Sequence, residues 1–224
     1  MDCYDGYVYR VDRNNFYRNE KKATVYTPAY VSDFLYDILS PEIPRGDGLI
    51  FDPCVGRGSL LRPWQRSGYA VRGIDIKDQG FRPTRVMNYL ELKSGDMSEA
   101  VSLVIMNPPF NIDSTTKKYI REHYSGRPLL PEVWFAKALE LFGPSVPIAM
   151  FTPYGFRLNQ TTTSRRWVKF LNHEYPDITG IVSLPKNVFD GILFHSEVLL
   201  FNLTLPQGHY FLNSIHESKR LAAA

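Results

Sequence analysis

Two short segments of this chain carry residue types and spacings that are suited to chemistry. The first is Asn107-Pro108-Pro109-Phe110, which directly follows the largely apolar residues 101–106. A proline fixes φ at roughly −65° and removes a backbone donor, and the residue before it is biased toward an extended conformation. This rigid turn can point the Asn107 side chain and the Pro108 carbonyl oxygen in one direction. Both oxygens can then accept from a single amino group, with Phe110 as a flat face beside them.

An amino group on an aromatic ring is a poor nucleophile because its lone pair is delocalised into the ring. Two acceptors on its N–H bonds draw electron density onto the nitrogen and favour a tetrahedral geometry, from which the lone pair can attack a sulfonium methyl group in line. Such catalysis depends on orientation and electrostatics and needs no general base. The alternative for residues 107–110 is a turn that only ends a strand.

The second segment is a glycine-bearing turn after the apolar residues 49–51. It runs from Asp52 through Gly56 and Gly58, and Asp75 follows about 20 residues after Gly56, at the end of the next predicted strand. Glycine permits positive φ and close approach of a ligand, and a helix start adds partial positive charge. Dinucleotide-binding folds place an acid here on the ribose hydroxyls. An acid at the end of both strands favours S-adenosylmethionine, which carries ribose hydroxyls, an ammonium and a sulfonium but no phosphate. The alternatives are an ordinary tight turn and a strand-end cap.

Alternating strands and helices must position these segments. A helix is expected after Thr27, with Thr27 as its cap and Pro28 at its first position. Residues 111–128 show no convincing period. Two late strands lack a long helix between them, which favours an antiparallel edge. The pattern predicts an α/β fold with a Rossmann-like, doubly wound and mostly parallel sheet. The expected strands are residues 48–51, 69–76, 84–90, 101–106, 146–152, 178–184 and 197–205, and further helices are expected at 131–142 and 164–171.

Composition limits the class of protein. The chain has 224 residues, of which 44% are hydrophobic and 22% charged, which indicates a globular domain and excludes a fibre or a disordered tail. Because the net charge is only +3, any contact with a nucleic acid has to come from local patches of basic residues. Two cysteines are typical of a reducing compartment, so we expect a cytoplasmic protein. We expect no signal peptide, no membrane span and no metal site, because the histidines and cysteines are scattered.

Basic residues gather in two segments that could contact a nucleic acid. One directly follows the Asn-Pro-Pro-Phe turn and includes Tyr119 and Tyr124, which could stack on bases, while lysine and arginine would contact phosphates. The alternative is a solvated helix face and a loop. The candidate substrate-binding residues are Lys117, Lys118, Arg121, Arg157, Arg165 and Arg166.

With DPCVGRGS, GID and NPPF in this order, the sequence resembles the S-adenosylmethionine-dependent methyltransferases that act on adenine N6. The upstream Val25-Tyr26-Thr27-Pro28 resembles a further cofactor motif, and the motif order is similar to the gamma arrangement found in type I restriction–modification methylase subunits. The resemblance covers roughly residues 25–205 and implies a class I methyltransferase fold. The cofactor-binding residues that it implies, or that the turn itself predicts, are Tyr26, Thr27, Pro28, Asp52, Pro53, Cys54, Gly56, Gly58, Asp75, Ile76, Asn88 and Asp96.

The chain departs from the family pattern at three points. Asn88 stands where an acid usually contacts the cofactor adenine, with Asp96 as the second candidate, and Ser102 replaces an acid in the strand before NPPF. Residues 1–24 are expected to be a lead-in, residues 25–205 the catalytic domain and residues 206–224 a tail, of which 221–224 resemble a vector remnant. With no recognition domain after the core, low sequence specificity or dependence on a specificity subunit is expected.

The resemblance and the residues together predict an enzyme that methylates a flipped adenine in DNA, held by Asn107, Pro108, Pro109 and Phe110. Three alternatives remain open from the sequence. An RNA adenine methyltransferase would orient the same amine. A non-catalytic nucleic-acid-binding subunit could keep the fold. A protein glutamine offers the same NH₂ group.

Overall fold

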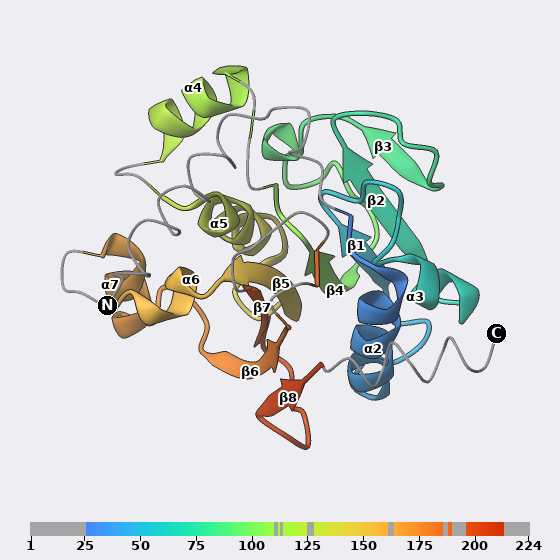
Figure 1. Cartoon of the computed structure of the whole chain (residues 1–224). Helices are drawn as coiled ribbons and strands as arrows, with labels where there is room; N and C mark the ends of the chain where they lie inside the picture. Colours follow the sequence, from blue (N-terminus) through green and yellow to red (C-terminus); the bar gives the residue numbers. More distant parts are fainter. Residues whose placement is uncertain are drawn as a thin grey trace, which may run out of the picture.

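A central β-sheet organises the chain (Figure 1). The computed structural model describes residues 26–109, 112, 114–124, 128–160, 164–185, 188–189 and 196–212. Within these residues the sheet has eight strands in the order β3-β2-β1-β4-β5-β7-β6-β8. The strands are β1 (Leu49–Asp52), β2 (Val71–Asp75), β3 (Thr84–Val86), β4 (Val101–Met106), β5 (Ile148–Pro153), β6 (Ile178–Ser183), β7 (Ser196–Phe201) and β8 (His209–Phe211).

The strand directions confirm a doubly wound, mostly parallel sheet. β3, β2, β1, β4 and β5 pair in parallel, whereas β7 is antiparallel to both β5 and β6. The predicted antiparallel element is therefore β7, which lies between β5 and β6. The predicted third strand stops at Val86, because the chain turns into a 3₁₀ helix, η3 (Tyr89–Glu91). β8 lies in the segment assigned to a tail, and it pairs in parallel with β6.

Helices cover both faces of the sheet (Figure 1). α2 (Ala29–Leu39) and α3 (Arg62–Arg66) pack on one face, and α5 (Leu130–Phe142) packs on the other. The remaining helices are η2 (Ser40–Glu42), α4 (Ser114–His123), α6 (Gly155–Leu158) and α7 (Arg165–Leu171). Among the helices that the structure describes, none has the length and apolar composition to cross a membrane.

Successive side chains of each strand enter two different cores, because strand side chains alternate between faces. Ile50 and Leu103 join the core beneath α2 and α3, whereas Phe51 and Val104 join the core beneath α5. Both cores are apolar, and the central strands are therefore buried on both sides. Such strands form a rigid support for the loops that leave their ends.

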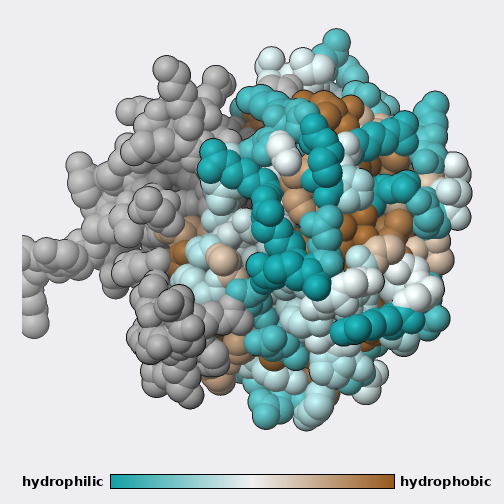
Figure 2. Space-filling model, turned by 90° about the vertical axis from the view of Figure 1, so that its right-hand side faces the viewer, coloured by the Kyte–Doolittle hydropathy of each residue, from teal (hydrophilic) through white to brown (hydrophobic). Residues whose placement is uncertain are grey.

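The surface outside these cores is mostly polar. Figure 2 views the side of the molecule that carries α3 and β3, and it shows hydrophilic side chains with small hydrophobic areas between them. Two of the larger exposed apolar side chains, Ile76 and Val86, follow or end the neighbouring strands β2 and β3.

Two local predictions were wrong. Residues 114–123 form α4, although the sequence showed no convincing period there. The period is weak because the buried face of this helix is narrow: Thr116 and Ile120 are buried one turn apart. Thr27 does not cap α2. The N-cap residue is Pro28, no side chain caps the helix, and the Thr27 hydroxyl bonds a different partner.

Candidate cofactor and acceptor site

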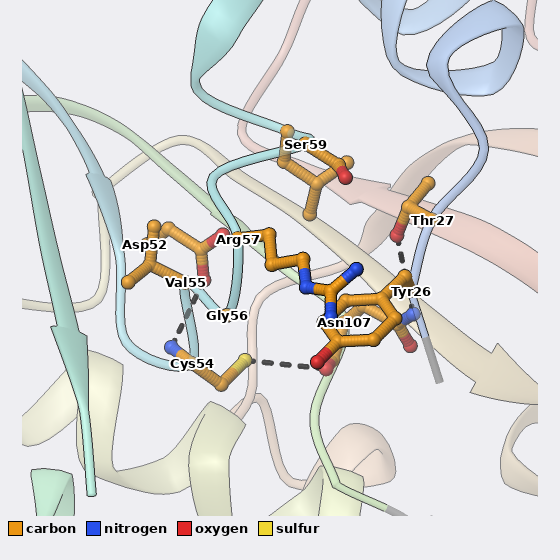
Figure 3. A pocket seen from close by; sticks show the side chains of 10 residues that line it. Tyr26, Thr27, Asp52, Cys54, Val55, Gly56, Arg57, Ser59 and Asn107 are labelled. Carbon is orange, nitrogen blue, oxygen red and sulfur yellow. Dashed lines mark hydrogen bonds between the residues drawn. The ribbon is translucent and has the colours of Figure 1, made fainter. Parts of the chain in front are cut away.

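A pocket lies at the carboxyl ends of β1 and β4 (Figure 3). The order of strands along the sheet reverses between β1 and β4, and open α/β sheets bind ligands at such a switch point. The lining combines the turn after β1, the turn after β4 and the residues before α2. The lining residues are Tyr26, Thr27, Asp52, Cys54, Val55, Gly56, Arg57, Ser59, Leu60 and Asn107.

The two glycines of the turn play different roles. Gly56 has φ +52° and lines the pocket, and its amide donates to Asp75 Oδ2 at 2.9 Å. Gly58 has φ +81°, and a Cβ there would lie 2.1 Å from the ring of Phe81. Gly58 is therefore required by packing against Phe81, and it is not among the residues that line the pocket.

A third glycine supports the turn from β2, and the sequence analysis missed it. A Cβ on Gly73 would lie 2.6 Å from the Cβ of Val55. Gly73 pairs with Asp52 in the sheet, so its missing side chain lets the turn after β1 settle onto β2. The only sequence signal was its place in Gly73-Ile74-Asp75.

Asp52 is a buried carboxylate at the floor of the pocket. It is 1% exposed, and its Oδ1 accepts from the Cys54 amide at 2.9 Å. Burial raises the pKa of Asp52 to about 7, although the Cys54 amide acts in the opposite direction. A buried carboxylate of this kind is stabilised by a positively charged ligand. Burial also raises the pKa of the Cys54 thiol, which therefore stays protonated.

Asn107 is held by contacts from both neighbouring segments (Figure 3). The Cys54 thiol donates to its backbone carbonyl at 3.2 Å, and its side-chain Nδ2 donates to Thr27 Oγ1 at 3.3 Å. Its Oδ1 is buried and has no hydrogen-bond partner. Because an unpaired buried acceptor is unfavourable, this oxygen is suited to accept from a bound donor. Pro108 is buried and Pro109 is half-buried; Phe110 lies outside the described residues.

Asp75 is the centre of a hydrogen-bond group beside the pocket. Besides the Gly56 amide, its carboxylate accepts from the Lys77 amide at 2.9 Å and from Gln79 Nε2 at 3.2 Å. The Tyr26 hydroxyl donates to Gln79 Oε1 at 2.7 Å. The guanidinium of Arg57 lies 4.5 Å from the centre of the Tyr26 ring, across the pocket mouth (Figure 3). The sequence carried no signal for Gln79 or Arg57.

Other predicted cofactor residues are more dispersed. Ile76 follows Asp75 and is 59% exposed, so its apolar side chain is open to a ligand. Asn88 Oδ1 accepts from the Leu90 amide at 3.1 Å and begins η3. Asp96 is exposed and caps a turn through the Lys93 amide, in the loop before the amino end of β4. Asn107 lies at the opposite end of β4, so the structure does not bring Asp96 together with Asn107. Pro53 lies in the turn between Asp52 and Cys54.

The predicted phosphate contacts divide into exposed residues and residues engaged within the protein. Arg166 is 6% exposed, donates to the Phe156 and Gly155 carbonyls and pairs with Glu132, so its guanidinium joins α7 to α5. Arg157 is partly exposed and forms two hydrogen bonds with the buried Glu197. The predicted contacts with exposed basic side chains are Lys117, Lys118 and Arg121 on α4 and Arg165 on α7.

Metal-ligating side chains do not gather in the described part of the chain. Within it, no group of three or more histidine, cysteine, aspartate or glutamate side chains is placed to hold a metal ion.

Comparison with solved structures identifies the fold. A protein from Listeria monocytogenes described as a class I S-adenosylmethionine-dependent methyltransferase superposes with a TM-score of 0.60 at 17% identity, covering 88% of this chain and 69% of that one. The methyltransferase subunit of a type I restriction–modification system from Streptococcus thermophilus gives 0.59 at 17% identity, covering 94% and 55%. A protein from Vibrio vulnificus described as a modification subunit of a type I restriction enzyme gives 0.61 at 14% identity, covering 96% and 56%.

These likenesses confirm the predicted fold: the chain has the class I S-adenosylmethionine-dependent methyltransferase fold. It spans about half the length of the two modification subunits. No protein-family model matches the chain, and no curated protein sequence matches it.

Proposed function

We propose that this chain is an S-adenosylmethionine-dependent methyltransferase that transfers a methyl group to N6 of adenine in DNA. The observation that carries the proposal is the buried, unpaired Oδ1 of Asn107 in one pocket with the carboxylate of Asp52. The first group is suited to an amino group and the second to a cation. A methyl donor with a positive charge and an amine acceptor satisfy both.

The residues around the pocket fit this cofactor. Asp52 would face its positive charge, Asp75 would accept from its ribose hydroxyls, and the exposed side chain of Ile76 would pack against its adenine. Two carboxylates at adjoining strand ends disfavour a ligand with phosphates, because like charges repel. When bound, S-adenosylmethionine supplies a methyl group activated by the sulfonium charge.

The acceptor amine would be held by the turn after β4. Asn107 Oδ1 accepts one N–H of the amine, and the Pro108 carbonyl oxygen accepts the other. These bonds orient the nitrogen and draw electron density onto it, which favours the tetrahedral geometry of the attacking nitrogen. The N–C bond would form as the S–C bond of the sulfonium breaks, and the nitrogen would then lose one proton to solvent. Thr27 Oγ1 accepts from Asn107 Nδ2 and so fixes the orientation of the amide, which leaves Oδ1 available to the acceptor amine.

DNA is the acceptor that we propose for two reasons. Exposed basic side chains lie on α4, which comes after β4, and on α7, which comes after β5. Both connections leave the sheet at the same edge as Asn107. The Vibrio and Streptococcus proteins belong, by their descriptions, to restriction systems. An adenine in a duplex must be extruded to reach such a pocket. The likeness to modification subunits also supports a partner subunit that contributes sequence specificity.

The test is methyl transfer from tritiated S-adenosylmethionine to duplex DNA, single-stranded DNA, RNA and a glutamine-containing peptide, followed by mass spectrometry of the digested products. We expect N6-methyl-2′-deoxyadenosine. Transfer to RNA alone would assign the chain to RNA, and cofactor binding without transfer to any acceptor would contradict catalysis.

Asn107→Ala should abolish most of this transfer while the cofactor still binds. Losing one pre-aimed acceptor should lower the rate by ~10²–10³, by analogy with deleting one oxyanion-hole donor. Asn172→Ala is the matched control, because Asn172 is an exposed residue at the end of α7 that bonds Glu174. Turnover of the Asn107 variant close to that of the control would remove Asn107 from the acceptor site.

A further inference from the structure

The carboxylate of Asp75 is almost fully engaged by the protein's own donors. Oδ2 accepts from the Gly56 amide at 2.9 Å and from Gln79 Nε2 at 3.2 Å, and Oδ1 accepts from the Lys77 amide at 2.9 Å. An ionised carboxylate offers about four lone-pair sites. Three are taken, so one site is left.

A ribose presents two neighbouring hydroxyls, and each donates one hydrogen bond. Two donors do not fit one free site, so one of the present donors must leave. Gly56 and Lys77 donate through backbone amides of the turns after β1 and β2, which the sheet holds in place. Gln79 donates through a flexible, half-buried side chain, and it is the donor that can move.

We propose that Gln79 is a built-in competitor for the ribose site, which a nucleoside with a vicinal diol must displace from Asp75 in order to bind. This inference rests on the proposed function, because it takes Asp75 as the residue that accepts from the cofactor ribose. It adds a residue that sets cofactor affinity and for which the sequence carried no signal.

The contacts of Tyr26 hold Gln79 in the competing position. The Tyr26 hydroxyl donates to Gln79 Oε1 at 2.7 Å, and the Arg57 guanidinium lies 4.5 Å from the centre of the Tyr26 ring. The Tyr26 ring also lies over Gly56, with Cε1 3.6 Å from the Cβ position of that glycine, and Gln79 Nε2 lies 4.0 Å from the same position. Displacing Gln79 therefore breaks two hydrogen bonds and frees Tyr26 from the pocket mouth.

The experiment compares the affinities of the full chain and its variants for S-adenosylmethionine by calorimetry. Gln79→Ala and Gln79→Met both remove the hydrogen bonds, and methionine keeps the length of the side chain. Both variants should bind about two- to tenfold more tightly than the wild type, the range expected for the loss of one competing hydrogen bond to Asp75. Gln207→Ala, in the exposed turn before β8, should leave the affinity unchanged.

A second measurement tests the diol directly. Adenosine and 2′,3′-dideoxyadenosine are each used to displace labelled S-adenosylmethionine, and only adenosine should gain from the Gln79 substitutions. Weaker or unchanged cofactor binding in both variants would overturn the proposal, as would a gain for alanine alone, which would indicate steric shielding. If the wild type binds S-adenosylmethionine and the variants do not differ from it, this inference fails while the proposed function stands. If neither the wild type nor a variant binds it, both fail.

Discussion

At the scale of single residues, the site consists of polar groups that are buried without full compensation. Asp52 has a carboxylate with a strongly raised pKa, and Asn107 has an acceptor without a donor. Each arrangement is unfavourable for folding and favourable for a ligand that supplies the missing cation or donor. The Thr27 hydroxyl contributes to the site in the same way, because it bonds Asn107 and leaves α2 without a side-chain cap.

The raised pKa of Asp52 predicts a pH dependence of cofactor binding. Below pH 7 most of the free protein carries a proton on Asp52, and a cationic ligand favours the ionised carboxylate. Binding there must release the proton, so affinity should rise with pH and level off above about 7. Between pH 6 and pH 7.5 the dissociation constant should fall roughly five- to tenfold. Calorimetry in buffers of different ionisation enthalpy measures both the affinity and the proton release.

Asp52→Asn is the control for this prediction. It keeps an oxygen for the Cys54 amide and does not titrate, so its affinity should be weaker and should follow only the ionisation of the ligand. The interpretation of Asp52 is refuted if wild type and variant show the same pH dependence.

At the scale of elements, the turn after β1 depends on its neighbours on both sides. Gly58 leaves room for the ring of Phe81, and Gly73 of β2 leaves room for Val55. Tyr26 and Asn107 approach the same turn from the segments before α2 and after β4. The pocket is therefore shaped by the packing of four separate segments.

Gly73→Ala should displace this turn. Its new Cβ would meet Val55 at 2.6 Å within a paired strand, so something has to shift. We expect a loss of about 1–3 kcal/mol in the free energy of unfolding, measured by urea denaturation, together with weaker cofactor binding. Gly208→Ala is the control, because a Cβ there meets nothing within 4 Å. Equal stability of the two variants would show that the turn does not rely on Gly73.

In the molecule as a whole, the candidate site and the predicted nucleic-acid contacts lie at one edge of the sheet. The pocket is at the carboxyl ends of parallel strands, and the turn after β4 and the connections to α4 and α7 begin at the same ends. The pairs Arg157–Glu197 and Arg166–Glu132 stabilise this side from within. Among the basic residues predicted to contact phosphates, those that are exposed lie on α4 and at the start of α7.

The exposed lysine and arginine side chains on α4 and α7 should bind nucleic acid in a way that does not depend on its sequence. Lys117→Ala and Arg165→Ala should weaken DNA binding on all sequences alike, and each should lower the slope of log K against log salt by about 1. Fluorescence anisotropy from low to moderate salt measures the effect. Lys93→Ala removes the same charge near the amino end of β4, the opposite edge, and should have little effect. A loss confined to one DNA sequence would indicate base readout instead.

The fold class and the centre of the candidate site could be predicted from the amino-acid sequence. Buried strands are recognisable as apolar runs, and the positions of Asp52, Gly56, Asp75 and Asn107 follow from motifs that are continuous in the chain and from strand ends that meet at one edge. Local stretches of this kind carry their own signal, because strand and turn preferences are set by neighbouring residues.

Which polar side chains are exposed and which are engaged could not be predicted without the folded structure. Arg166 looks like a surface base in the sequence, yet it is buried against Glu132, and Asp96 lies at the far end of β4. Gly58 and Gly73 serve packing partners distant in the chain, and Gln79 meets Asp75 and Tyr26 through a loop with no motif. These outcomes depend on contacts between segments far apart in sequence. Whether a charged or polar group is exposed, paired or buried is set by the groups that surround it in the fold, and a local pattern does not contain them.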